Sequence, residues 1–204
     1  MVAPLAVGPY HQWMAPFPLA TSLLLLPFLG ACVVLCIPSH RRGFHRMLGL
    51  LIGLVQCALG CWMWLGYEAK AGLQWVDDWS TCLSGFGVRL GVDGVALPMI
   101  LLMPLLALAA LLVPNENSSS CEKTSALRVL LLLSGAMGVL LSLNLYLLCV
   151  SWSLVMLVIA GWVGAGTRSH VPSAGPTMLF VVLVGLALFV AGVSLVLNHL
   201  GTET

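Results

Sequence analysis

The chain has 204 residues, of which 60% are hydrophobic and 7% are charged. Soluble globular domains carry about 25% charged residues and at most about half apolar ones, so this composition excludes that class. Eight basic and seven acidic side chains leave a net charge of +1, which excludes the strongly basic surface that nucleic-acid binding requires. The sequence therefore predicts an all-α protein that crosses a membrane several times.

Apolar segments long enough to span a membrane follow one another along the chain, since about 20 residues cross a hydrocarbon core about 30 Å thick. A stretch at residues 126–163 is too long for one span, because a single helix of that length would measure about 57 Å. Asn144 lies near its middle, and Asn tolerates tight turns, so we expect two helices there. The prediction is one domain with about six transmembrane helices, at residues 17–37, 47–67, 92–113, 126–143, 145–163 and 177–197.

The connections between these segments indicate an orientation. Six of the eight Lys and Arg side chains fall in the first, third and fifth connections, which the positive-inside rule places on the cytoplasmic or matrix side. Residues 68–91, which contain the Asp77–Asp78 doublet, are expected to form a short ordered segment against the membrane surface. Residues 114–124 are expected to form a polar loop.

Chemically active side chains are scarce inside the predicted spans. No Asp, Glu, Lys, Arg or His lies in the middle of any of them, although such residues carry intramembrane function by default. The five histidines are interpreted as interfacial polar residues at span ends: His11, His40, His45, His170 and His199. The pairs Cys32/Cys36 and Cys57/Cys61 each share a helix face, and we interpret them as small packing residues in preference to ligands of a soft metal. No catalytic, cofactor-binding or metal-binding residues are therefore assigned.

Cys82 and Cys121 lie outside the predicted spans and are the pair that could form a disulfide, although reduced thiols are the preferred interpretation. The second span carries Gly49 and Gly53 in a G-x-x-x-G pattern, which favours close helix packing. Gly185 and Gly192 suggest the same packing role in the last span.

Three motifs carry a family resemblance. Residues 90–98 read LGVDGVALP and contain Asp93 and Gly94, residues 131–140 read LLLSGAMGVL around Gly135, and residues 143–154 read LNLYLLCVSWSL with Trp152 and Ser153. Together they resemble the antiporter-like subunit 4 (subunit M) of respiratory NADH:quinone oxidoreductase, complex I. The resemblance implies that the chain forms the N-terminal six-helix portion of the antiporter-like (Mrp-type) bundle.

The chain departs from the family pattern at the groups that carry protons. The residue after the motif tryptophan is a glutamate of the proton-transfer machinery in the family, and here that position is Ser153. The glutamate that precedes Gly-Ala-Met in the family is Ser134 here. Family members also have more helices, including a broken helix with a lysine that partners the glutamate, and this lysine has no counterpart among the six spans.

The resemblance implies a split or truncated subunit 4 in the membrane arm of complex I, which takes part in the proton-translocating module mainly as a structural component. Such a subunit has no catalytic centre of its own, and FMN, iron–sulfur clusters and ubiquinone are expected elsewhere in the complex. The implied partners are other membrane-arm subunits, a separate chain with the remaining helices, and lipids. The mitochondrial inner membrane is the expected location, with a bacterial plasma membrane as the alternative. Alternative functions are a subunit of a related cation/proton antiporter or membrane-bound hydrogenase, and a membrane scaffold or assembly protein.

Overall fold

A computed structural model describes residues 18–38, 43–68, 72–79, 88–113, 119–166 and 174–201. A helix lies in each of the six segments that were expected to span the membrane, but the third begins only at Ala96. The fourth begins at Ser119, so residues 119–124 are helical and not part of the polar loop expected at residues 114–124. Two short strands precede the third helix. The elements are α1 (Leu19–Cys36), α2 (Phe44–Leu65), β1 (Gln74–Asp78), β2 (Arg89–Val92), α3 (Ala96–Leu112), α4 (Ser119–Leu141), α5 (Leu145–Gly166) and α6 (Ala174–Gly201).

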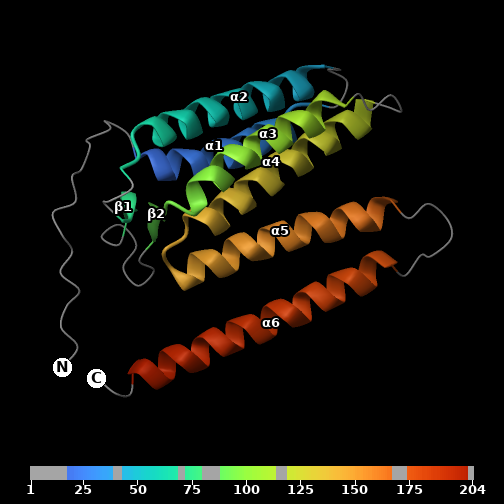
Figure 1. Ribbon diagram of the computed structural model, residues 1–204. Helices are drawn as coiled ribbons and strands as arrows, with labels where there is room; N and C mark the ends of the chain where they lie inside the picture. Colours follow the sequence, from blue (N-terminus) through green and yellow to red (C-terminus); the bar gives the residue numbers. More distant parts are fainter. Residues whose placement is uncertain are drawn as a thin grey trace.

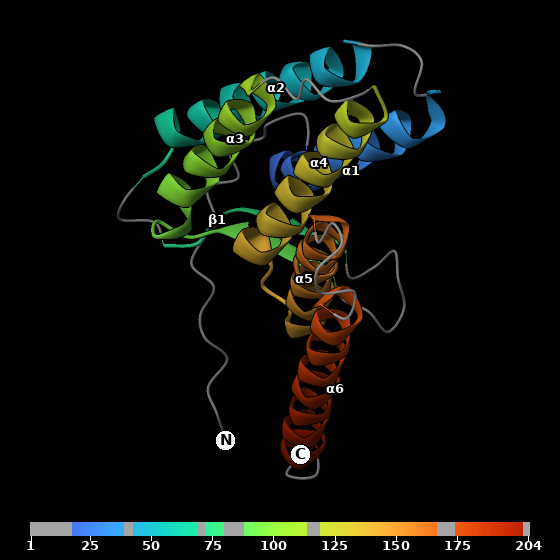
Figure 2. The same ribbon diagram turned by 90° about the vertical axis from the view of Figure 1, so that its right-hand side faces the viewer.

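The first four helices form a bundle, and the last two extend from one side of it. Helix α4 packs against α1, α2, α3 and α5, while α6 packs against α5 (Figure 1). Figure 2 shows α5 and α6 projecting from the bundle of α1–α4. Four helical segments are long and apolar enough to cross a membrane, namely Leu19–Cys36, Phe44–Leu65, Glu122–Leu141 and Leu145–Trp162, and two shorter apolar segments are Ala96–Leu112 and Pro176–Gly192. The described chain is therefore a helical membrane protein, as its composition predicts.

Asn144 separates α4 from α5. Its side-chain Oδ1 accepts a hydrogen bond from the Tyr146 N–H at 3.1 Å, and its carbonyl accepts one from the Leu148 N–H at 3.0 Å. The first bond satisfies the Tyr146 N–H, which has no partner within the helix, and the second is the first backbone bond of α5, as expected when Asn is the N-cap. Asn144 thus ends one helix and begins the next within three residues, which allows α5 to run back along α4.

The surface segment contains a structural feature that the helical periodicity did not indicate, a pair of antiparallel strands. Gln74 lies opposite Val92 and Asp77 opposite Leu90, with an irregular register between the two pairs. Trp75 falls in this irregular part and has a positive φ of 54°, which is uncommon for a residue other than glycine. A further bridge joins Leu90 to Ser142, so the strand pair contacts the turn between α4 and α5.

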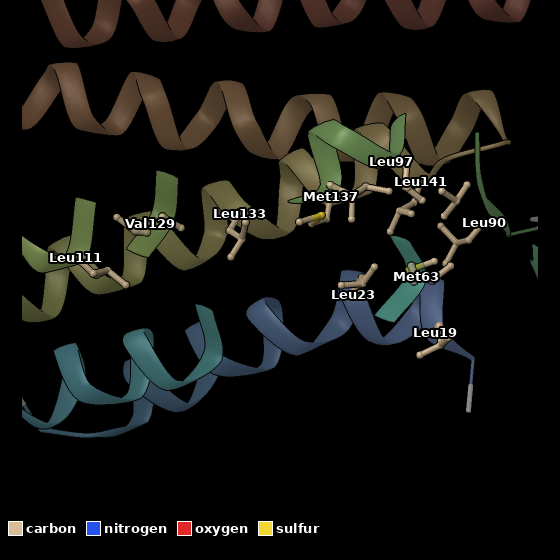
Figure 3. Packing of buried hydrophobic residues seen from close by; sticks show 14 of the residues in the cluster. Leu19, Leu23, Met63, Leu90, Leu97, Leu111, Val129, Leu133, Met137 and Leu141 are labelled. Carbon is tan, nitrogen blue, oxygen red and sulfur yellow. The ribbon is translucent and has the colours of Figure 1, made fainter. Parts of the chain in front are cut away.

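The core of the bundle lies between α1, α2, α3, α4 and β2. Leu23 of α1, Met63 of α2 and Met137 of α4 are fully buried and belong to one cluster, which Leu90 of β2 closes at the strand end (Figure 3). The glycines of α2 bring α3 close. A Cβ placed on Gly49 would lie 2.9 Å from a methyl group of Leu111, and one on Gly53 would lie 2.7 Å from a methyl group of Leu108. The G-x-x-x-G pattern thus acts in packing, whereas Gly185 and Gly192 of α6 face open space in the described structure.

Candidate functional site

Ser153, the position that the resemblance assigns to proton transfer, lies within α5 and is half-buried. Its hydroxyl donates a hydrogen bond of 2.5 Å to the carbonyl of Cys149, one turn earlier in the same helix. Such back-bonding within a helix satisfies a serine locally. The neighbouring Trp152 is 48% exposed. A serine held in this way contributes no titratable group.

Gly135 lies in the close contact between α4 and α5. A Cβ at this position would lie 2.7 Å from Cγ2 of Val155 and 3.2 Å from the carbonyl oxygen of Ser151. Gly138, one turn later, has the Ser151 side chain directly against it. The two glycines therefore let α5 pack against α4, which indicates a structural role for the Gly-Ala-Met motif in this chain.

Asp93 and Gly94 lie at the end of the bundle that carries the strands. The Asp93 carbonyl accepts hydrogen bonds from the N–H groups of Ala96 and Leu97, at 3.0 and 3.1 Å, and so caps the start of α3. A Cβ on Gly94 would lie 2.5 Å from the Tyr67 hydroxyl, so the absence of a side chain lets Tyr67 pack there. The structure thus brings Gly135 close to the helix that carries Trp152 and Ser153, but it places Asp93 and Gly94 in a separate helix-capping region.

The charged side chains at the strand end hold helix ends together. One carboxylate oxygen of Asp77 accepts hydrogen bonds from both the N–H and the hydroxyl of Thr21, each 2.8 Å long, and so caps α1 from another segment of the chain. Asp78 forms an ion pair with Arg89 at 2.9 Å. Asp77 thereby joins the strand pair to α1.

The opposite end of the bundle is tied by basic side chains. Arg46 donates to the carbonyls of Leu111 and Leu112 at the end of α3, and the Lys123 ammonium donates to the carbonyls of Leu35 and Ile37 at the end of α1. Cations at these positions satisfy free carbonyls and oppose the negative end of each helix dipole. These charges therefore stabilise helix ends and leave the middle of the bundle uncharged.

Two polar side chains lie together inside the bundle, Gln56, which the sequence did not single out, and Ser134, which it marks as a replaced glutamate position. Gln56 of α2 is fully buried and donates from Nε2 to the carbonyl of Leu23 in α1, at 2.7 Å. Ser134 of α4 is 2% exposed and donates from Oγ to the carbonyl of Leu24, at 3.2 Å. Both reach one turn of α1, just before Pro27. The sequence signal for this site was a polar residue on the face of α2 that otherwise carries small or apolar residues.

The environment of His45 differs from the expectation. It was expected to be an interfacial polar residue, but α2 begins at Phe44, so His45 lies within its first turn and is fully buried. Neither ring nitrogen has a hydrogen-bond partner among the described residues. His11, His40 and His170, like Cys82, lie outside the described residues, as do the side chains of Cys121 and His199.

The described residues contain no group of three or more His, Cys, Asp or Glu side chains that could hold a metal ion. Cys32, Cys36, Cys57, Cys61 and Cys149 are free thiols. What the described arrangement offers chemically is a bundle whose charges lie at its two ends and whose middle carries neutral hydrogen-bonding groups.

These features describe a polytopic helical membrane protein, and comparison with known proteins shows what it is related to. The chain is 28% identical over 196 residues to NAD(P)H-quinone oxidoreductase chain 4 of Trichodesmium erythraeum, covering 92% of this chain and 34% of that protein. It is 30% identical over 187 residues to a chain 4 of Synechococcus elongatus, covering 88% and 34%. NADH-quinone oxidoreductase subunit M of Pseudomonas aeruginosa is 26% identical over 191 residues, covering 85% and 37%. The resemblance to subunit 4, or M, is thereby confirmed over most of the chain.

The chain spans about a third of the length of these curated relatives. No family model matches it. Among solved structures, a chain of the membrane-bound sulfane sulfur reductase, an archaeal respiratory membrane complex, matches with a TM-score of 0.73 and 18% identity over 89% of this chain and 37% of that one. This match shows that the helical arrangement of the chain is shared with a membrane subunit of a respiratory complex.

Proposed function

We propose that the chain is a membrane-arm subunit of respiratory complex I, corresponding to part of subunit 4, and that it supports the proton-translocating module mainly as a structural component. The relatives named chain 4 and subunit M support the assignment to this arm. The hydrogen bond of Ser153 within α5 is the observation that supports the structural role. Its hydroxyl is bonded within α5, at the position where the resemblance places the proton-carrying glutamate.

The remaining components follow from this proposal. NADH oxidation, FMN, the iron–sulfur clusters and ubiquinone belong to other chains of the complex, and this chain binds none of them. Its partners are the other membrane-arm subunits and, in the split-subunit form of the proposal, a separate polypeptide that supplies further helices. The mitochondrial inner membrane is the proposed location. A bacterial plasma membrane is the alternative, which the bacterial relatives favour.

The assembly is tested by purifying the chain in a mild detergent and identifying the chains that migrate with it. The proposal expects NADH dehydrogenase subunits among them, and their absence would overturn it. In the split-subunit form, one of these chains carries an intramembrane lysine on a further helix. If that chain is missing while the NADH dehydrogenase subunits are present, the split-subunit form fails and the membrane-arm assignment stands.

The structural role is tested separately with Ser153→Glu in the assembled complex. Because the half-buried serine lies against its own helix and the described part of α5 has no charged partner for a carboxylate, the number of protons translocated per electron should not change. A clear rise in that ratio would show that the position still lies on a working proton path. Ser153→Ala is the matched control, since it removes the hydroxyl without adding a titratable group.

A second candidate is a subunit of a related cation/proton antiporter or membrane-bound hydrogenase. The observation that favours it is the fold shared with a chain of the archaeal sulfane sulfur reductase complex. The same purification distinguishes it, because the copurified redox arm would then lack NADH dehydrogenase subunits. A scaffold or assembly protein predicts instead that Asp93 and Gly94 can be replaced without effect on NADH:quinone activity.

A further inference from the structure

Pro27 creates an unpaired backbone acceptor in the middle of α1. Proline has no N–H, so the carbonyl four residues earlier, that of Leu23, loses its partner within the helix. Both Leu23 and Pro27 are buried in the bundle, where no bulk water reaches this carbonyl. A buried acceptor of this kind needs a partner from another element.

Two neighbouring helices supply donors at this point. Gln56 Nε2 of α2 bonds the freed carbonyl of Leu23 at 2.7 Å, and Ser134 Oγ of α4 bonds the adjacent carbonyl of Leu24 at 3.2 Å. The two side chains thus approach one turn of α1 from different helices. The result is a cluster of two carbonyls, one amide and one hydroxyl within an otherwise apolar bundle.

One atom of this cluster has no partner among the described residues. Gln56 Oε1 is buried and accepts no hydrogen bond, although an amide oxygen accepts up to two. Rotating the amide by half a turn does not remove the problem, because it would place Oε1 against the Leu23 carbonyl and leave the NH₂ group unpaired. The side chain is therefore held in its present orientation, with an acceptor available to a donor from outside the described chain.

We propose that this acceptor binds a single buried water molecule, held between Gln56 and the Leu23–Leu24 turn of α1. Water fits the chemistry because it donates to Oε1 without bringing a charge into the apolar bundle. Buried waters typically make two to four such bonds. The described contacts of the cluster include no carboxylate, which makes it a site for a neutral ligand and not for a cation.

Apolar residues separate this site from the basic end of the bundle. Ile52, one turn before Gln56 on α2, packs with Ala31 and Val34 of α1 and Leu130 of α4 in a second buried cluster. His45 lies beyond that cluster, about 16 Å from Gln56 along the helix axis. The proposed site is thus an isolated hydration site in the described bundle and does not continue toward His45. This proposal does not depend on which respiratory complex contains the chain.

Isotope-edited infrared spectroscopy of the full chain in lipid bilayers tests the proposal. The chain has three glutamines, Gln12, Gln56 and Gln74. With ¹³C in the side-chain carbonyl of glutamine, the spectrum of the wild type minus that of Gln56→Leu isolates the side-chain carbonyl band of Gln56. We expect this band at the lower frequency of a hydrogen-bonded amide. We also expect an O–H stretching band that shifts in H₂¹⁸O and is missing from the variant, which identifies water as the donor.

Two results would overturn the proposal. A Gln56 band at the frequency of a free amide carbonyl would show that Oε1 is unbonded. A bonded carbonyl without any band sensitive to H₂¹⁸O would show that a protein group is the donor. Gln56→Met, which keeps the side-chain length without a strong acceptor, replaces the leucine variant if that variant does not fold. Gln74→Leu is the matched control, since it removes a glutamine outside the bundle and should leave the ¹⁸O-sensitive band in place.

Discussion

The bond between Gln56 and Leu23 should matter because of Pro27, and a double-mutant cycle can show this dependence. Gln56→Leu removes the donor and leaves the Leu23 carbonyl without a partner in a buried position. Pro27→Ala restores an N–H four residues after Leu23 and returns to that carbonyl its ordinary helix partner. The same leucine substitution should therefore be costly when Pro27 is present and tolerated in the Pro27→Ala background.

The size of the effect follows from the state of the carbonyl. Leaving a buried acceptor unpaired costs about 1–3 kcal/mol, whereas hydrogen bonds between helices in a membrane protein average about 0.6 kcal/mol and reach about 1.7. We expect Gln56→Leu to lower the free energy of unfolding by about 1–2 kcal/mol when Pro27 is present, since the carbonyl has no second donor. In the Pro27→Ala background the loss should fall to about 0.5 kcal/mol or less.

Reversible unfolding of the chain in mixed micelles of mild detergent and dodecyl sulfate, followed by far-ultraviolet circular dichroism, measures these four variants. Ser134→Ala is the matched control because it removes a donor to the Leu24 carbonyl, whose helix partner Phe28 has an N–H of its own. Its cost should be the same with and without the Pro27→Ala substitution. Equal costs of Gln56→Leu in the two backgrounds would refute the argument that the glutamine compensates for the proline.

Other contacts give further predictions for the same unfolding assay. Asp77→Ala removes the carboxylate that caps α1 and should cost about 0.5–2 kcal/mol. Asp78→Ala breaks an exposed ion pair and should cost less than about 1 kcal/mol. Similar losses for the two variants would contradict the assigned capping role. Gly138→Ala places a methyl group against Ser151 and should cost about 1–3 kcal/mol. Gly161→Ala of α5 meets open space and should be neutral or stabilising by up to about 1 kcal/mol, so equal effects of the two alanines would contradict close packing of α4 on α5.

Much of the fold could be predicted from the sequence because the membrane imposes simple constraints. Backbone groups in hydrocarbon must be paired within the segment, so a long apolar run is a helix. The need for a turn followed from length, since residues 126–163 as one helix exceed the membrane thickness, and Asn144 indicated its position because Asn tolerates tight turns. The strands could not be predicted in this way. Their pairing joins Gln74 to Val92 across an intervening segment, and such long-range partners leave no local periodicity.

The candidate site was predicted less completely, because chemical identity alone does not indicate environment. Ser153 could be identified as the replaced position from the motif around it, but its bond to the Cys149 carbonyl is visible only in the structure. Gln56 could not be identified in the same way, because it is not ionisable and its partner is a backbone carbonyl of another helix. The proline that makes the amide necessary lies 29 positions earlier on another helix, so the two residues have no relation in the sequence.

The bundle satisfies free backbone carbonyls in two places, at the helix ends and in the apolar interior, and it uses different residues in each. Helix ends have several free carbonyls and lie near water, so Arg46 and Lys123 can satisfy them while their charges remain partly solvated. The break at Pro27 leaves one free carbonyl in the apolar interior, where a charged donor would itself need a counter-charge. A neutral amide satisfies that carbonyl without one, but its own oxygen must then be satisfied in turn. The proposed structural role of this chain in a proton-translocating arm is therefore compatible with the proposed buried water, because that water completes the hydrogen bonds of a broken helix and needs no titratable residue to hold it.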